Sequence, residues 1–131
     1  MKKEIKIEII VDYKKKKNYV NQIILIALEK LPDEVARFFS KNPIIFSVET
    51  RESNDLIDAH TFSLQAFRNK KAFIHLYPHV WRYSEKKIIE IIRHELAHIF
   101  LGHTKKIIKS FKEESRNERD VERLVKKWSN C

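Results

Sequence analysis

The alternation of apolar and polar positions divides the chain into a strand-rich first part and a helical last third. Residues 3–11 alternate between polar and apolar side chains, which is typical of a half-buried strand. Three further strands are predicted, at residues 43–50, 61–67 and 72–77. A turn at residues 69–71 separates the last two, and Pro78 ends the fourth strand. Helical periodicity predicts two short helices, at residues 19–31, which stop at Pro32, and at residues 33–40.

The last third carries two longer helices. Residues 85–101 form an amphipathic segment that begins after Ser84, a favourable N-cap, and ends at Gly102, the one glycine of the chain. A final helix is predicted from about residue 111 to residue 128. Because strands and short helices come first and two helices follow, we expect an α+β fold with a small antiparallel or mixed sheet.

Domain organisation follows from length and composition. The 131 residues contain no repeat and no linker rich in glycine, serine or proline, so we expect a single domain. Its strands and short helices occupy residues 1–83 and its two long helices occupy residues 84–131. Hydrophobic residues make up 43% of the chain, enough for a core, which excludes a disordered basic tail.

Charge and cysteine content narrow the class of protein. The formal net charge is +9, and the run of lysines at residues 14–17 is either a solvated loop, the interpretation we favour, or a phosphate contact. The single cysteine, Cys131, excludes an internal disulfide, and no apolar run suits a signal peptide or a membrane span. We therefore expect a cytoplasmic protein, and the abundance of lysine and glutamate favours a thermophilic source.

The sequence His94-Glu95-Leu96-Ala97-His98 carries the candidate chemistry. Residues four apart share one face of a helix, so both imidazoles can reach a single Zn²⁺ ion. Glu95 lies about 100° round the helix from His94, close to the ion without binding it. From there it can accept a proton from a zinc-bound water.

A third ligand is expected, because catalytic zinc sites commonly use three protein ligands and leave one position for water. His103 is one candidate if Gly102 turns the chain back. The final helix offers Glu118, which edges the predicted apolar stripe, and Glu114 one turn earlier on the same edge. Glu122, one turn later, suits a hydrogen bond to a ligand histidine.

These residues resemble the gluzincin clan of zinc peptidases, over HELAH, IFLGH and SRNERDVERLV. The short chain is most similar to the single-domain minigluzincins, and phage-type peptidases that inactivate repressors share a similar stretch. The resemblance implies that His94, His98 and Glu118 bind zinc and that Glu95 is the catalytic base. The clan's Glu-x-x-Ala-Asp pattern has Glu122 in place of its aspartate here.

The resemblance also implies an edge strand that pairs with an extended peptide substrate. Residues 72–77 are expected to be that strand, since they are nearest in sequence to the zinc helix. Alternation places His75 and Tyr77 on one face of it, and these two, His60 and Tyr83 are candidates for stabilising the oxyanion.

The main hypothesis is therefore a zinc-dependent endopeptidase that acts on peptides or proteins. A latent, zymogen-like form is a further hypothesis, in which the thiolate of Cys131 fills the open zinc position. The alternative is a basic nucleic-acid-associated module, or a peptidase that acts on DNA-bound repressors.

Overall fold

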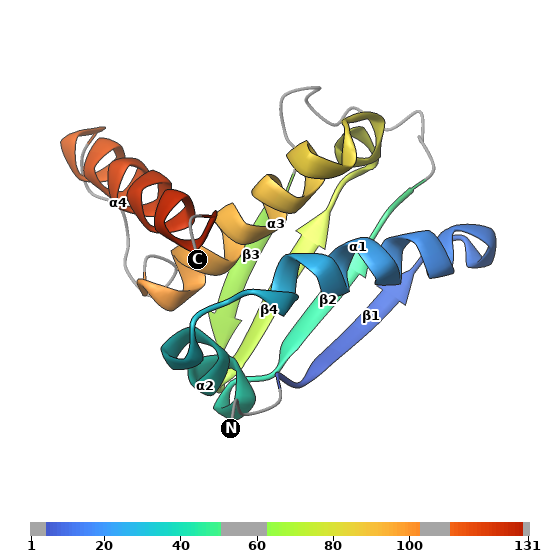
Figure 1. Ribbon diagram of the computed structural model, residues 1–131, viewed down its shortest axis with the longest axis horizontal. Helices are drawn as coiled ribbons and strands as arrows, with labels where there is room; N and C mark the ends of the chain where they lie inside the picture. The colour runs from blue at the N-terminus through green and yellow to red at the C-terminus, as the bar shows by residue number, and fades with distance from the viewer. Residues whose placement is uncertain (1–4, 51–62, 103–110, 130–131) are drawn as a thin grey trace.

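The computed structural model describes residues 5–50, 63–102 and 111–129, which form a β-sheet with its helices gathered on one face (Figure 1). The strands are β1 (Ile7–Val11), β2 (Ile44–Val48), β3 (Ser63–Arg68) and β4 (Lys71–Leu76). The α-helices are α1 (Lys17–Glu29), α2 (Asp33–Lys41), α3 (Glu85–Phe100) and α4 (Phe111–Ser129). Two short 3₁₀ helices, η1 (Lys14–Lys16) and η2 (Pro78–Arg82), precede α1 and α3.

The sheet has the strand order β1-β2-β4-β3. β1, β2 and β4 run parallel to one another, while β3 runs antiparallel to β4. The parallel pair β1 and β2 is joined by a crossover that contains α1 and α2, as parallel pairing requires. This mixed sheet with separate helical segments confirms the expected α+β fold.

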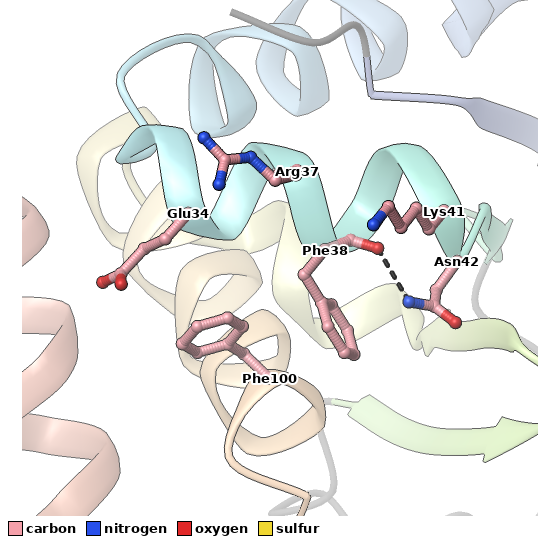
Figure 2. A pocket seen from close by; sticks show the side chains of 6 residues that line it. All are labelled: Glu34, Arg37, Phe38, Lys41, Asn42 and Phe100. Carbon is pink, nitrogen blue, oxygen red and sulfur yellow. Dashed lines mark hydrogen bonds between the residues drawn. The ribbon is translucent and has the colours of Figure 1, made fainter.

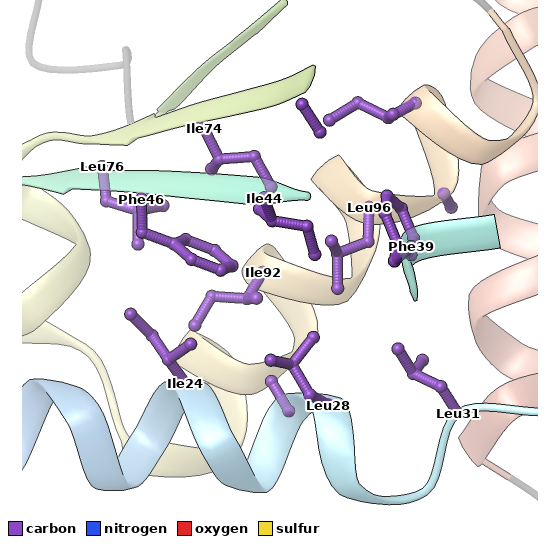
Figure 3. Packing of buried hydrophobic residues seen from close by; sticks show 14 of the residues in the cluster. Ile24, Leu28, Leu31, Phe39, Ile44, Phe46, Ile74, Leu76, Ile92 and Leu96 are labelled. Carbon is purple, nitrogen blue, oxygen red and sulfur yellow. The ribbon is translucent and has the colours of Figure 1, made fainter. Parts of the chain in front are cut away.

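The hydrophobic core lies between the sheet and the helices α1 and α3 (Figure 3). Ile9, Phe46 and Ile74 are aligned across three neighbouring strands and face this core. α3 contributes Ile88, Ile92 and Leu96, which recur every four residues and are all fully buried. The covered face of the sheet and the apolar face of α3 therefore meet in one core.

Local signals position the elements that lead to the candidate site. The hydroxyl of Ser84 accepts a hydrogen bond from the backbone N–H of Lys87 at 3.3 Å, which confirms Ser84 as the N-cap of α3. Gly102 has a φ of +76°, a conformation that glycine adopts without strain, just after α3 ends. Asn69 and Lys70 have φ values of 53° and 61°, the pattern of a type I′ turn that joins β3 to β4.

Two expectations about the elements are wrong. Residues 72–77 are not an edge strand, because β4 pairs with β2 on one side and with β3 on the other. Residues 14–17 are exposed, as a solvated segment would be, but they form η1 and the first residue of α1 rather than a loop. None of the described helices is long and apolar enough to cross a lipid bilayer.

Candidate metal centre

The predicted histidine pair lies on one side of α3, toward α4. His94 and His98 are four residues apart, and their rings are 4.8 Å apart between centroids at an angle of 72°. The Nε2 atoms of the two rings are separated by 3.2 Å. The helical spacing expected from the sequence thus brings both donor atoms to one point.

α4 brings a carboxylate to the same point. Glu118 Oε2 lies 3.2 Å from His94 Nε2, and Glu118 Oε1 lies 2.9 Å from His98 Nε2. Val121, three residues later, is fully buried, as is nearly all of Trp128, so the apolar face of α4 is docked in the core. Glu118 stands at the edge of that face, which is why its carboxylate reaches the histidines of α3.

The donor set and its spacing fit a zinc ion. Zinc is bound by imidazole nitrogen and carboxylate oxygen at about 2.0–2.2 Å, so ligand atoms at tetrahedral corners are about 3.3 Å apart. The two Nε2 atoms are 3.2 Å apart, Glu118 Oε2 lies 3.2 Å from one of them and Glu118 Oε1 lies 2.9 Å from the other, so the three groups are close enough to surround one ion. Imidazole lone pairs and a carboxylate repel one another at such distances unless a proton or a metal ion lies between them. These three residues are therefore the ones that would hold zinc.

The cluster is open to solvent on one side. The Glu118 side chain is 46% exposed and the His94 side chain 32% exposed, whereas the His98 side chain is only 10% exposed. Structural zinc sites are closed by four protein ligands, while catalytic sites have three and an accessible position. Among the described residues, these three form the one group of at least three side chains that could hold a metal.

Glu95 and Arg93 flank His94 on α3. Glu95 is 7% exposed, so its carboxylate is buried beside the histidine pair. Arg93 points to the other side of the helix and donates from Nε to the backbone carbonyl oxygen of Ala27 at 3.1 Å. That carbonyl belongs to the last turn of α1, where a cation also interacts favourably with the helix dipole. Burial lowers the pKa of the Arg93 guanidinium. Arg93 therefore fixes the histidine-bearing part of α3 against α1.

The structure does not bring the other predicted residues to this cluster. His75 and Tyr77 lie on the face of the sheet opposite to the buried Ile74 and Leu76, away from the core and α3. His75 Nδ1 is 3.0 Å from the hydroxyl of Ser47 and its Nε2 is 3.0 Å from Glu49 Oε1. The prediction that one of the two stabilises an oxyanion at the metal centre is therefore wrong.

Several remaining candidates stay predictions. Glu122 is exposed on α4, with no contact to His94 or His98 among those that the structure records. His103, His60 and Cys131 lie outside the described residues, as does the side chain of Glu114.

The edge strand beside α3 is β3, and not β4 as expected from the sequence. The N–H of Ala72 donates to the carbonyl oxygen of Pro43, and the carbonyl oxygen of Leu76 accepts from the N–H of Glu49. Every second residue of β4, starting from Ala72, therefore directs its backbone N–H and C=O toward β2. The intervening residues of β4, including Phe73, direct their backbone N–H and C=O groups toward β3. On β3, therefore, Ala66 bonds to β4, while Gln65 and Phe67 direct N–H and C=O outward. The turn at residues 69–70 indicates the β3–β4 hairpin, but no local pattern in the sequence predicts the order of the strands in the sheet.

A shallow groove lies on the far side of α3 from the metal ligands, between α2 and the end of α3 (Figure 2). Phe38 lies at its centre and contacts Phe100 and Phe67, with ring centroids 5.5 Å and 5.9 Å apart. Phe100 comes two residues after His98 and so points to the opposite side of the helix. The groove is lined by residues of α2, Asn42 and Phe100 of α3, and it is not part of the metal centre.

Comparison with models of known protein families, with curated proteins and with solved structures finds no match to this chain.

Proposed function

We propose that the protein is a zinc-dependent peptidase. The observation that carries the proposal is the convergence of His94, His98 and Glu118 beside the buried Glu95. Two imidazoles and one carboxylate are the ligand set of one class of catalytic zinc site. The exposure of Glu118 and His94 leaves room for water and substrate at the ion.

Zinc, when bound, would lower the pKa of water and polarise a peptide carbonyl. Glu95 would accept the proton of the attacking water and pass it to the leaving amine. Its position suits this role, because it follows His94 directly and lies about 100° round α3 from it. The buried carboxylate is also shielded from competing solvent, which strengthens its interaction with a proton close by.

The edge strand supports a peptide as the substrate. Gln65 and Phe67 present backbone N–H and C=O groups along the outer edge of β3, and β3 contacts α3. An extended peptide bound there would gain backbone hydrogen bonds of the kind that add a strand to a sheet. Gln65 shares a face with Ile74, so its side chain lies on the α3 side of that edge.

The test compares Glu95→Gln with Glu90→Gln, which makes the same change at an exposed position of α3. We expect about one zinc per chain in the wild type and in both variants, measured by metal mass spectrometry. Cleavage of an unstructured protein substrate, followed by mass spectrometry of the products, should be lost only in Glu95→Gln. Since general acid–base groups contribute about 10²–10⁴-fold, the rate should fall by at least 10²-fold. Wild-type cleavage by Glu95→Gln, or no zinc in the wild type, would contradict the proposal.

A further inference from the structure

Two basic segments that are far apart in sequence meet at one place on the surface. The rings of Tyr19, in the first turn of α1, and Trp81, in η2, pack edge to face with centroids 6.2 Å apart. This contact joins the start of α1, which follows the lysines at residues 14–17, to η2, which precedes the cations at residues 82–87. We call residues 14–19 and 81–87 together the basic patch.

The basic patch holds most of the net charge of the chain. It contains seven lysine and arginine residues and a single carboxylate, Glu85, so it contributes +6 of the formal +9. All seven of these cations are exposed. α4 is the obvious rival surface, but between Arg116 and Lys127 its five cations are offset by three carboxylates, a net charge of +2. Of these two described surfaces, the basic patch therefore carries the larger net positive charge.

The lysines at residues 14–17 are unfavourably placed for the helix that follows them. Lys17 is the first residue of α1, the other three precede it, and the first turn of α1 contains no acidic residue. Cations at a helix N-terminus are repelled by the helix dipole, so this placement is unfavourable for α1. All four side chains are exposed, so a ligand can reach their charges.

Aromatic rings accompany the charges. Tyr19 is 43% exposed and Tyr83 is 41% exposed. The half-buried ring of Trp81 packs edge to face against Tyr19, and Tyr83 follows Trp81 by two residues. Exposed rings among lysines and arginines are the combination that binds single-stranded nucleic acid, through base stacking and phosphate contacts.

We propose that the basic patch binds single-stranded nucleic acid, with its lysines on the phosphates and Tyr19 and Tyr83 stacking on bases. A duplex does not account for the exposed tyrosines, because its bases are already stacked on each other. An anionic membrane surface is less suited, because the exposed large apolar residues of the patch are both tyrosines and none is aliphatic. This binding goes beyond peptidase activity and does not depend on the metal centre.

The test measures binding of a fluorescent 20-nucleotide oligo(dT) to the full chain by anisotropy, over a series of salt concentrations. One variant replaces all four lysines at residues 14–17 with glutamine. Its matched control makes four charge-removing changes on α4: Arg116→Gln, Arg119→Gln, Arg123→Gln and Lys126→Gln. Since each phosphate contact to a single strand contributes about 0.7 to the slope of log K against log salt, the lysine variant should lose about 3 in slope. The control should lose less than 1.

Stacking is tested separately at the two tyrosines. Tyr19→Ala and Tyr83→Ala should each weaken binding by at least about fivefold, whereas Tyr19→Phe and Tyr83→Phe, which keep the ring, should bind within twofold of the wild type. Thermal unfolding of the lysine variant gives the check on folding. Its melting temperature should equal or exceed that of the wild type, because the repulsion from the α1 dipole is removed.

Four results would overturn the proposal. The first is no binding of the wild type to oligo(dT) at 50 mM salt, and the second is an equal loss of slope in the α4 control. The third is equal affinity for duplex DNA, combined with no effect of the tyrosine changes. The fourth is tyrosine-dependent binding to vesicles of anionic lipid without binding to the oligonucleotide. The zinc content and the Glu95→Gln result are unaffected by any of these outcomes, so the two proposals fail independently.

Discussion

Zinc binding should stabilise the fold, because its proposed ligands come from two helices. His94 and His98 lie on α3 and Glu118 lies on α4, so one bound ion would link α4 to α3. A ligand that binds only the folded state at 100 times its Kd adds about 2.7 kcal/mol to the free energy of unfolding. For a chain of this length, 1 kcal/mol corresponds to about 3–5 °C. The melting temperature should therefore rise by about 8–13 °C.

Glu118→Gln is the informative perturbation. The amide has nearly the same shape as the carboxylate, so the packing of α4 is retained, but the ligand loses its charge. If the substitution lowers zinc affinity 100-fold, a free zinc concentration of 100 times the wild-type Kd is equal to the Kd of the variant. The stabilisation then drops to about 0.4 kcal/mol, and the melting temperature should rise by less than about 2 °C.

The assay is thermal unfolding followed by circular dichroism at 222 nm, with free zinc fixed by a chelator buffer. Glu90→Gln is the matched control, since it makes the same change at an exposed position of α3, one turn before His94. It should show the full wild-type shift. An equal shift in Glu118→Gln would refute Glu118 as the third ligand. No shift in the wild type would refute zinc binding at the cluster altogether.

Three further predictions test the surrounding structure. Lys70→Gly should raise the free energy of unfolding by about 0.5–1 kcal/mol, measured by urea denaturation, because Lys70 has a φ of 61° and glycine adopts it without strain. Gln65→Pro should slow peptide cleavage with little change in stability, because the N–H that it removes points outward from β3. The control, Ala66→Pro, breaks a hydrogen bond to β4 and should destabilise the fold by about 3 kcal/mol or more. Arg93→Met should lower the free energy of unfolding by about 1–2 kcal/mol through loss of its bond to Ala27, with Arg93→Lys intermediate.

Most elements could be predicted because their signals are local. The cap at Ser84, the stop at Pro32 and the glycine at position 102 each depend on a few neighbouring residues, and helices and strands follow from periods of 3.6 and 2. The strand order could not be predicted in this way. β4 lies inside the sheet because it pairs with β2, a contact across more than twenty residues that no local pattern encodes.

The same distinction holds for the candidate site. His94 and His98 converge because of helical spacing alone, and Glu118 was placed at the edge of an apolar stripe that Val121 and Trp128 confirm. Alternation correctly put His75 and Tyr77 on one face of their strand. It could not say which face α3 would cover, since that depends on the residues of the neighbouring strands. The basic patch likewise combines two basic segments that can be recognised in the sequence, but only the tertiary structure brings them together.

Under the proposed function, the packing of α4 would couple zinc binding to local structure. α4 contacts mainly α3, and its like charges at Arg119, Arg123 and Lys127 repel along one face at four-residue spacing. Val121 and Trp128 are buried in the core, Leu124 and Val125 pack against it, and Glu118 reaches the histidines of α3. Opening of α4 would remove the proposed third ligand while α3 kept both histidines in place. The observed affinity for zinc would then include the free energy of docking α4, so that changes at Trp128 weaken zinc binding without touching a ligand.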